Sequence, residues 1–240
     1  MKTITIHQLI GCLLLLGHSM TAWGQNSALK KYEQVIHSFY QTETMAFQSN
    51  MILYEGLHPE KKFDQMRLEY RKKGDRIYMR HEEFEILQDD QDYLYMDHED
   101  RIVYQMPMSE ELLVTSSLAI DQFKGIIQLM HLKGETFSVR DGVDGIRFSA
   151  PEFSQTKIEI HYKVENQQMV KAMMALDLSG IEDVSHELDG KRLEIYYQEY
   201  ENEGVSFPFR KKQLLAADEN GQLKSGPYKG YQFINTAAEK

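Results

Sequence analysis

The spacing of apolar residues changes near residue 44. Between Ala28 and Gln41 they recur every three or four positions, which predicts an amphipathic helix with Ser27 as its N-cap. Its apolar stripe consists of Leu29, Tyr32, Val35, Ile36 and Phe39. From Thr44 onward apolar and polar residues alternate instead, which is typical of half-buried strands. We therefore expect one helix packed on a sheet.

The alternating region between Thr44 and Met106 predicts an antiparallel meander. Met66, Leu68 and Tyr70 alternate with charged residues, so one face of that strand is apolar. Short polar breaks separate the segments, and breaks of this length join antiparallel neighbours. The expected strands start at Thr44, near Met66, and at Arg76, Glu83, Tyr93 and Arg101.

Pro107 ends the meander and a helical insert follows, in which Ile120, Phe123, Ile127 and Met130 share one side. Strands then return over residues 135–140, 146–148, 157–164, 170–176 and 192–200. In the 157–164 segment polar residues occupy alternate positions, so we expect that face to be solvated. No linker or repeat marks a boundary. We expect a single domain over residues 25–240, with a C-terminal extension from about Ala216.

Residues 1–24 read as a secretory signal peptide. Lys2 precedes an apolar run, and the small residues Ala22 and Gly24 precede an expected cleavage site before Gln25. Leu9-Ile10-Gly11-Cys12 also looks like the lipobox of a bacterial lipoprotein. Cleavage there would leave the four leucines Leu13 to Leu16 on the mature N-terminus, so we favour Gln25 over a lipid anchor on Cys12. An exported, periplasmic protein without a transmembrane span is expected.

The composition of the chain limits the classes of partner that the protein is expected to bind. The formal net charge of −10 argues against nucleic acid, which is bound through clustered Lys and Arg. The single cysteine, Cys12, lies in the expected signal peptide, so neither disulfides nor a cysteine nucleophile belong to the mature chain.

No pattern for catalysis or metal binding emerges. His81-Glu82 lacks a second histidine four residues after the first, and the acidic residues between Asp89 and Asp100 lack the spacing of a calcium loop. Gly-x-Ser-x-Gly, phosphate-loop and dinucleotide motifs are absent from the sequence. We therefore expect no enzyme, no cofactor and no metal; a hydrolase whose catalytic triad is dispersed along the chain is the alternative that stays open.

The order of elements and two strands carry a family resemblance. Met66-Arg67-Leu68-Glu69-Tyr70 and Asp92-Tyr93-Leu94-Tyr95-Met96-Asp97 resemble strands of the LolA/LolB-like superfamily of outer-membrane lipoprotein carriers. The resemblance covers about Ser27 to Arg210. It implies an α+β fold in which a curved antiparallel sheet forms an open or incomplete β-barrel capped by a few helices.

The resemblance also implies a function: a periplasmic carrier or binder of lipid-bearing cargo, a lipoprotein or an acyl lipid, held in an apolar cavity without catalysis. The expected cavity lining is Phe47, Met51, Met66, Leu68, Met79 and Tyr95. The expected lid is Ile120, Phe123, Ile127 and Met130, and Arg67 is placed at the cavity mouth. The alternative is that the lining fills a core, the helix is a permanent cover and Arg67 is a solvated surface residue.

A second function stays open at this point. The same fold with a filled core could act as a scaffold that binds other envelope proteins. Tyr228, Tyr231 and Phe233 near the C-terminus are candidates for such contacts, with packing onto the sheet as their other use.

Overall fold

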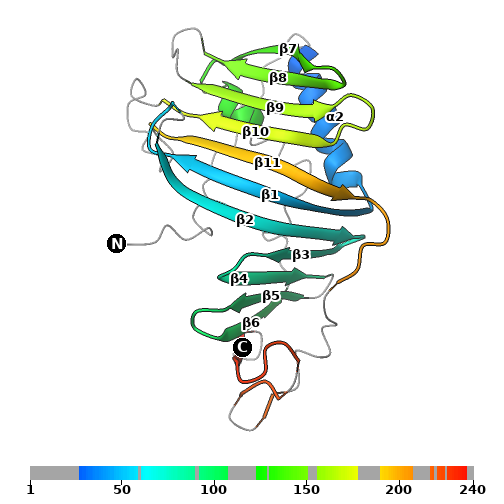
Figure 1. The fold of residues 1–240 in the computed structure, drawn as a ribbon, viewed down its shortest axis with the longest axis vertical. Helices are drawn as coiled ribbons and strands as arrows, with labels where there is room; N and C mark the ends of the chain where they lie inside the picture. Colours follow the sequence, from blue (N-terminus) through cyan, green and yellow to red (C-terminus); the bar gives the residue numbers. More distant parts are fainter. Residues whose placement is uncertain are drawn as a thin grey trace. The chain divides into compact units, whose positions relative to one another are not determined.

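The computed structural model describes residues 27–58, 61–89, 92–107, 123–128, 130–150, 156–177, 190–207, 217–218, 221–224 and 226–236. The expected signal peptide and Ile120 lie outside these residues. Twelve strands form one open sheet in the order β12-β6-β5-β4-β3-β2-β1-β11-β10-β9-β8-β7 (Figure 1). The predicted fold class, a mostly antiparallel open sheet with few helices, is confirmed.

The elements follow the predicted order closely. Helix α2 spans Ser27–Gln41. The strands are β1 (Thr44–Tyr54), β2 (Lys62–Lys73), β3 (Arg76–Arg80), β4 (Phe84–Gln88), β5 (Asp92–Asp97), β6 (Ile102–Pro107), β7 (Lys133–Arg140), β8 (Val143–Ser149), β9 (Lys157–Lys163), β10 (Met169–Ala175), β11 (Arg192–Glu201) and β12 (Gln232–Asn235). Residues 123–128 form a second helical segment. Within the described residues, no helix combines the length and apolar character needed to cross a membrane.

The chain forms two compact units. Unit 1 comprises Met1–Gln41, Met51–Gln65 and Val114–Tyr196, and unit 2 comprises Thr42–Asn50, Met66–Leu113 and Tyr197–Lys240. Strands β1, β2 and β11 each contribute residues to both units. The single domain expected from the sequence stays a prediction.

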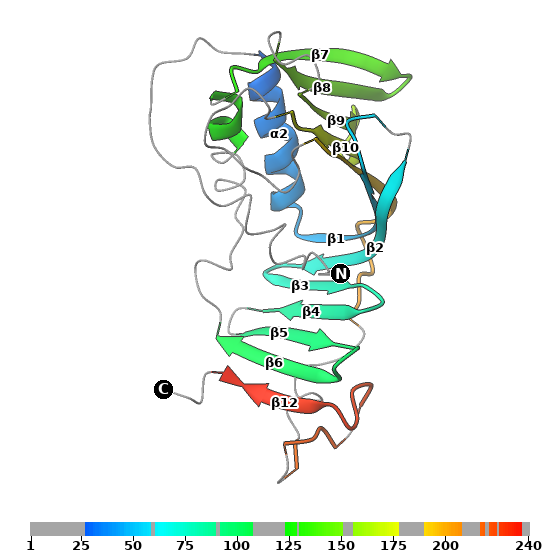
Figure 2. The same ribbon diagram turned by 90° about the vertical axis from the view of Figure 1, so that its left-hand side faces the viewer.

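In unit 1, α2 packs against β7 and β8 (Figure 2). Its buried residues are Ala28, Tyr32, Val35 and Ile36, four positions at helical spacing. Gly134 lets the helix approach the sheet, because a Cβ atom there would lie 2.8 Å from the Cβ of Ala28. Tyr32 stacks on Phe123 at 4.0 Å and meets the ring of Phe148 edge-on. Three residues of the predicted stripe, Tyr32, Val35 and Ile36, are therefore buried in this unit, whereas Leu29 and Phe39 are half-buried.

In unit 2, the meander β3 to β6 is continued by β12, which runs parallel to β6 (Figure 2). One face of the meander packs against residues from the C-terminal part of the chain. This core cluster consists of Tyr78, Leu87, Leu94, Met96, Val103, Leu223 and Tyr228, with Phe207, Ala217, Tyr231 and Phe233 packed around it. The aromatic residues near the C-terminus therefore pack onto the sheet, and Tyr228, only 3% exposed, is not available as a docking surface.

Two details differ from the expectations. The polar face of β9 is only partly solvated: Lys157, His161 and Lys163 are half-buried, and Glu159 is only 9% exposed, because cationic side chains of β8 and β9 close over it. In β1 the buried positions move from Phe47 and Ser49 to Ile52 and Tyr54, so burial changes face along the strand.

Candidate functional site

The register of unit 2 aligns one row of apolar side chains across five strands. Tyr70 of β2 pairs with Met79 of β3, which pairs with Ile86, then Tyr95, then Tyr104 of β6. Directly paired residues point to the same face, so these five side chains form an "apolar row". Its face is opposite to that of Leu87 and the core cluster, because neighbouring residues of a strand point to opposite sides. Ile86 is buried and the other four are half-buried.

The apolar row ends in a group of four rings that we call the Phe47 cluster: Phe47, Tyr70, Tyr197 and Tyr200. The ring of Phe47 stacks on Tyr70 at 4.8 Å and lies 5.4 Å from Tyr197 and 5.3 Å from Tyr200. Aromatic side chains have a large apolar area and few rotamers, so this cluster forms a rigid apolar surface on the face of the apolar row.

The predicted cavity residues fall mostly on this face. Met79 and Tyr95 belong to the apolar row, and Phe47 stacks on its first member. Met66 and Leu68 precede Tyr70 by four and two residues, so alternation puts them on the same face. Phe47 is buried, whereas the other predicted lining residues, Met51 included, are half-buried. Their role as a ligand-binding surface stays a prediction.

The remaining predicted site residues lie elsewhere. Arg67 is exposed and, next to Leu68 in β2, points to the opposite face. Phe123, Ile127 and Met130 are buried in unit 1, exposed by 6%, 2% and 2%. Such burial is what the permanent-cover alternative predicts. The lid and mouth roles stay predictions.

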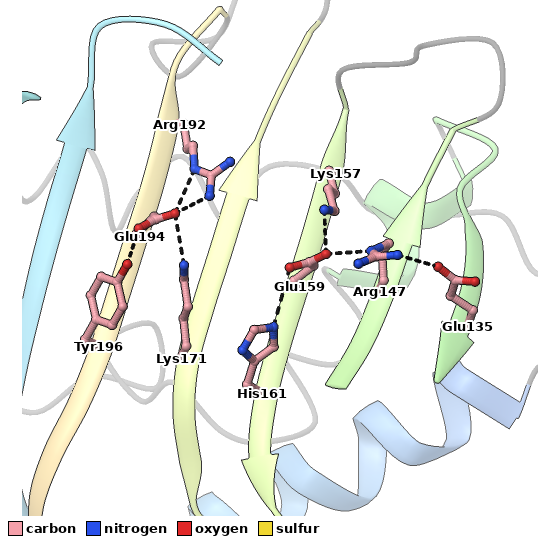
Figure 3. Close-up of polar contacts among 9 residues, drawn as sticks. All are labelled: Glu135, Arg147, Lys157, Glu159, His161, Lys171, Arg192, Glu194 and Tyr196. Carbon is pink, nitrogen blue, oxygen red and sulfur yellow. Dashed lines mark hydrogen bonds and ion pairs between the residues drawn. The ribbon is translucent and has the colours of Figure 1, made fainter. Parts of the chain in front are cut away.

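Two buried carboxylates lie on one face of unit 1, in networks that the sequence did not reveal (Figure 3). Glu194 of β11, 2% exposed, accepts from Arg192 Nε at 2.8 Å, from Lys171 Nζ at 3.0 Å and from the Tyr196 hydroxyl. Burial raises the pKa of Glu194, but the hydrogen bonds from Tyr196, Arg192 and Lys171 outweigh it and lower the pKa to about 2. Glu194 is therefore ionised near neutral pH.

Glu159 of β9 has a similar arrangement. Its Oε1 atom accepts from Arg147 Nε at 2.5 Å and pairs with Lys157 Nζ at 2.6 Å (Figure 3). His161 Nε2 lies 3.5 Å from Oε2, too far for a well-formed hydrogen bond. Burial raises the pKa of Glu159, and contacts from His161, Lys157 and Arg147 more than reverse this, so the pKa lies well below its usual range. A carboxylate held ionised in this way is a poor proton donor, which suits sheet stabilisation better than acid catalysis.

A third buried carboxylate, Glu85 of β4, lies in unit 2. Its Oε2 accepts from the hydroxyls of Tyr78, at 2.7 Å, and Tyr228, while its Oε1 lies 3.2 Å from His98 Nε2. Burial, and then the bond to Glu85, raise the pKa of both tyrosines, which act here as donors. His98 Nδ1 lies 3.3 Å from the Tyr231 hydroxyl, so the ring connects Glu85 to Tyr231. This network joins the C-terminal residues to the meander.

Each carboxylate also has a partner on a neighbouring strand, such as Lys171 for Glu194 and Arg147 for Glu159, and neither strand alternation nor a motif reveals such cross-strand contacts. Among the residues that the structure describes, no group of three or more His, Cys, Asp or Glu side chains could hold a metal ion.

Known proteins offer structural likenesses only. No family model matches the sequence, and no curated protein matches it. An uncharacterized conserved protein from Thermus thermophilus is similar in structure, at 8% identity and a TM-score of 0.45, over 86% of this chain and 98% of its own. A LolA superfamily protein from Nitrosomonas europaea matches at 14% identity and a TM-score of 0.32, over 77% of this chain and 96% of its own.

A putative outer membrane lipoprotein-sorting protein domain from Vibrio parahaemolyticus matches at 12% identity and a TM-score of 0.30, over 74% of this chain and 92% of its own. Proteins of the superfamily expected from the sequence are thus among the solved structures that this chain resembles. These likenesses concern the fold alone.

Proposed function

We propose that this protein is a non-catalytic carrier or binder of lipid-bearing cargo, a lipoprotein or an acyl lipid, in the periplasm. The apolar row and the Phe47 cluster contact the acyl chains of the cargo. One observation supports this proposal most strongly. Tyr70, Met79, Tyr95 and Tyr104 are half-buried in one row, on the face of the sheet opposite to the core cluster of unit 2.

The chemistry of this face suits acyl chains. Met66, Leu68 and Met79 are flexible apolar side chains, and thioethers adapt to ligands of variable shape. Burial of an acyl chain gains about 0.8 kcal/mol per methylene, so about fifteen methylenes give on the order of 12 kcal/mol before the cost of lost freedom is subtracted. No charged anchor is needed for binding of this strength.

Mass spectrometry of lipids extracted from the natively purified mature protein tests the proposal. We expect acyl lipid or lipopeptide in stoichiometric amount. Leu68→Gln and Met79→Gln should reduce lipid occupancy severalfold while the protein stays folded. Lys73→Gln is the matched control, because Lys73 is exposed at the end of the same strand β2. Arg67→Gln, measured alongside, tests the mouth role of Arg67.

A protein that carries no lipid and binds none when it is added would contradict the proposal. That outcome would favour the scaffold alternative, in which the same fold binds other envelope proteins. Pull-down from envelope extracts with the intact chain would then be the next experiment. Truncation after Gly221 is unsuitable for it, because Leu223 and Tyr228 belong to the core cluster of unit 2.

A further inference from the structure

Within the described part of the chain, one polar atom of Tyr200 has no hydrogen-bond partner. Its hydroxyl oxygen is buried, and among the described residues none forms a hydrogen bond with it. Burial, and to a lesser extent Tyr197, raise the pKa of this hydroxyl, so it carries its proton. A buried hydroxyl without a partner is costly, and natural proteins satisfy nearly all such groups.

An irregular residue places Tyr200 in the Phe47 cluster. Tyr197 and Tyr200 are three residues apart, so in a regular strand their rings would point to opposite faces. Both nevertheless lie close to the ring of Phe47. Glu199 between them has a φ of 54°, in the left-handed region, and such a residue interrupts the alternation as a bulge does.

The irregularity is held in place from the other face of the sheet. Glu199 Oε2 accepts a hydrogen bond from Gln48 Nε2, and Gln48 alternates with Phe47 in β1. A left-handed glutamate is unfavourable, and strained residues of this kind collect at binding sites. Glu199 therefore brings the ring of Tyr200, with its buried hydroxyl, to the Phe47 cluster.

We propose that the Tyr200 hydroxyl donates a hydrogen bond to a carbonyl oxygen of the bound cargo, so that the site selects acyl esters or amides over hydrocarbon chains without a carbonyl. This inference rests on the proposed function and names its ligand class. Phe47, Tyr70 and Tyr197 contact the alkyl part of the acyl chain. The position of the Tyr200 hydroxyl determines where the carbonyl group of the cargo lies in the site. A site built to donate to an oxygen discriminates against ligands that lack it, because its donor is then left unpaired.

Two lipids of equal chain length test the inference. Dipalmitoylglycerol has ester carbonyls, whereas its dihexadecyl ether analogue has none. The full mature chain should bind the ester form about fivefold to tenfold more tightly, the ratio expected of one neutral hydrogen bond. Tyr200→Phe should abolish that preference by lowering the affinity for the ester. Tyr162→Phe in β9 of unit 1 is the matched control and should keep the preference.

The stability of the lipid-free protein gives a second readout. Tyr200→Phe should leave the melting temperature unchanged or raise it, because no bond within the protein is lost. Equal binding of the two lipids, an ester preference that survives Tyr200→Phe, or a clear drop in melting temperature would each overturn the inference. If neither lipid binds, the proposed function itself fails, which is a distinct result.

Discussion

Tyr228 donates a hydrogen bond to Glu85, across 143 residues of sequence, and the accepting oxygen is the one that Tyr78 also contacts. Both bonds are buried. The carboxylate therefore connects two strands of unit 2 and the C-terminal part of the chain in one network. The stability of the folded protein should depend on both hydroxyls.

Tyr228→Phe and Tyr78→Phe should each lower the free energy of unfolding by about 2 kcal/mol, the usual loss for a hydrogen bond to a charged group. The double variant should lose less than the sum, because the two donors share one oxygen. Urea unfolding followed by circular dichroism measures both quantities. Tyr104→Phe on the other face should cost under about 0.5 kcal/mol. Strictly additive losses would contradict the shared network.

Glu194 should make stability depend on pH in acid. Its pKa of about 2 in the folded protein is below the ordinary 4.5, so the folded state favours the ionised form. The resulting stabilisation is fully present above pH 4.5 and is lost as pH falls toward 2. Glu194→Gln should lower the free energy of unfolding by about 3 kcal/mol at pH 7, because it leaves the half-buried Lys171 and Arg192 without their carboxylate, and by less at pH 3.

The control for that experiment is Glu55→Gln, which removes an exposed ion pair with Lys61 and should change stability by under about 1 kcal/mol. Curves of unfolding free energy against pH that run parallel for Glu194→Gln and the parent would show that Glu194 is not the titrating group.

Gly134→Ala should displace α2 from the sheet of unit 1. The added Cβ would lie 2.8 Å from both the Ala28 Cβ and a ring carbon of Phe148. Both neighbours are buried, so we expect a loss of about 2 kcal/mol, the usual cost of overpacking. Thermal unfolding measures it. Gly56→Ala, where nothing lies within 4 Å, should be nearly neutral. Equal effects of the two substitutions would refute the close-packing argument.

The N-terminus of the exported protein should begin at Gln25. Intact-mass measurement of periplasmic protein distinguishes this from the lipobox alternative, which would give a chain that begins at an acylated Cys12. Cys12→Ser should leave export and the mature mass unchanged. Retention of the variant as unprocessed precursor would instead favour the lipoprotein reading.

The sequence predicted the strands well because alternation depends only on a residue's neighbours along the chain. Met66, Leu68 and Tyr70 were assigned to one face by alternation, and the pairing of Tyr70 with Met79 connects that face to the apolar row. The helix over Ser27–Gln41 was equally clear from its spacing.

The sequence pattern did not predict features that depend on contacts between strands or on the backbone conformation of a single residue. Glu159 looked solvated by alternation, yet Arg147 from the adjacent strand buries it. Tyr200 would be assigned to the face opposite Tyr197, and only the backbone angle of Glu199 reverses that. The position of the buried Tyr200 hydroxyl therefore could not be predicted from the alternation of apolar and polar residues.

The parallel pairing of β12 with β6 has a consequence for biogenesis. Thr236 bonds to the backbone of Gln105 across 131 residues of chain. Until the ribosome has added those residues, β6 has an unpaired edge and the core around Leu94 and Met96 lacks Leu223 and Tyr228. Unit 2 thus cannot be completed during most of synthesis. For the periplasmic role proposed above, that delay is favourable, since premature folding would block translocation.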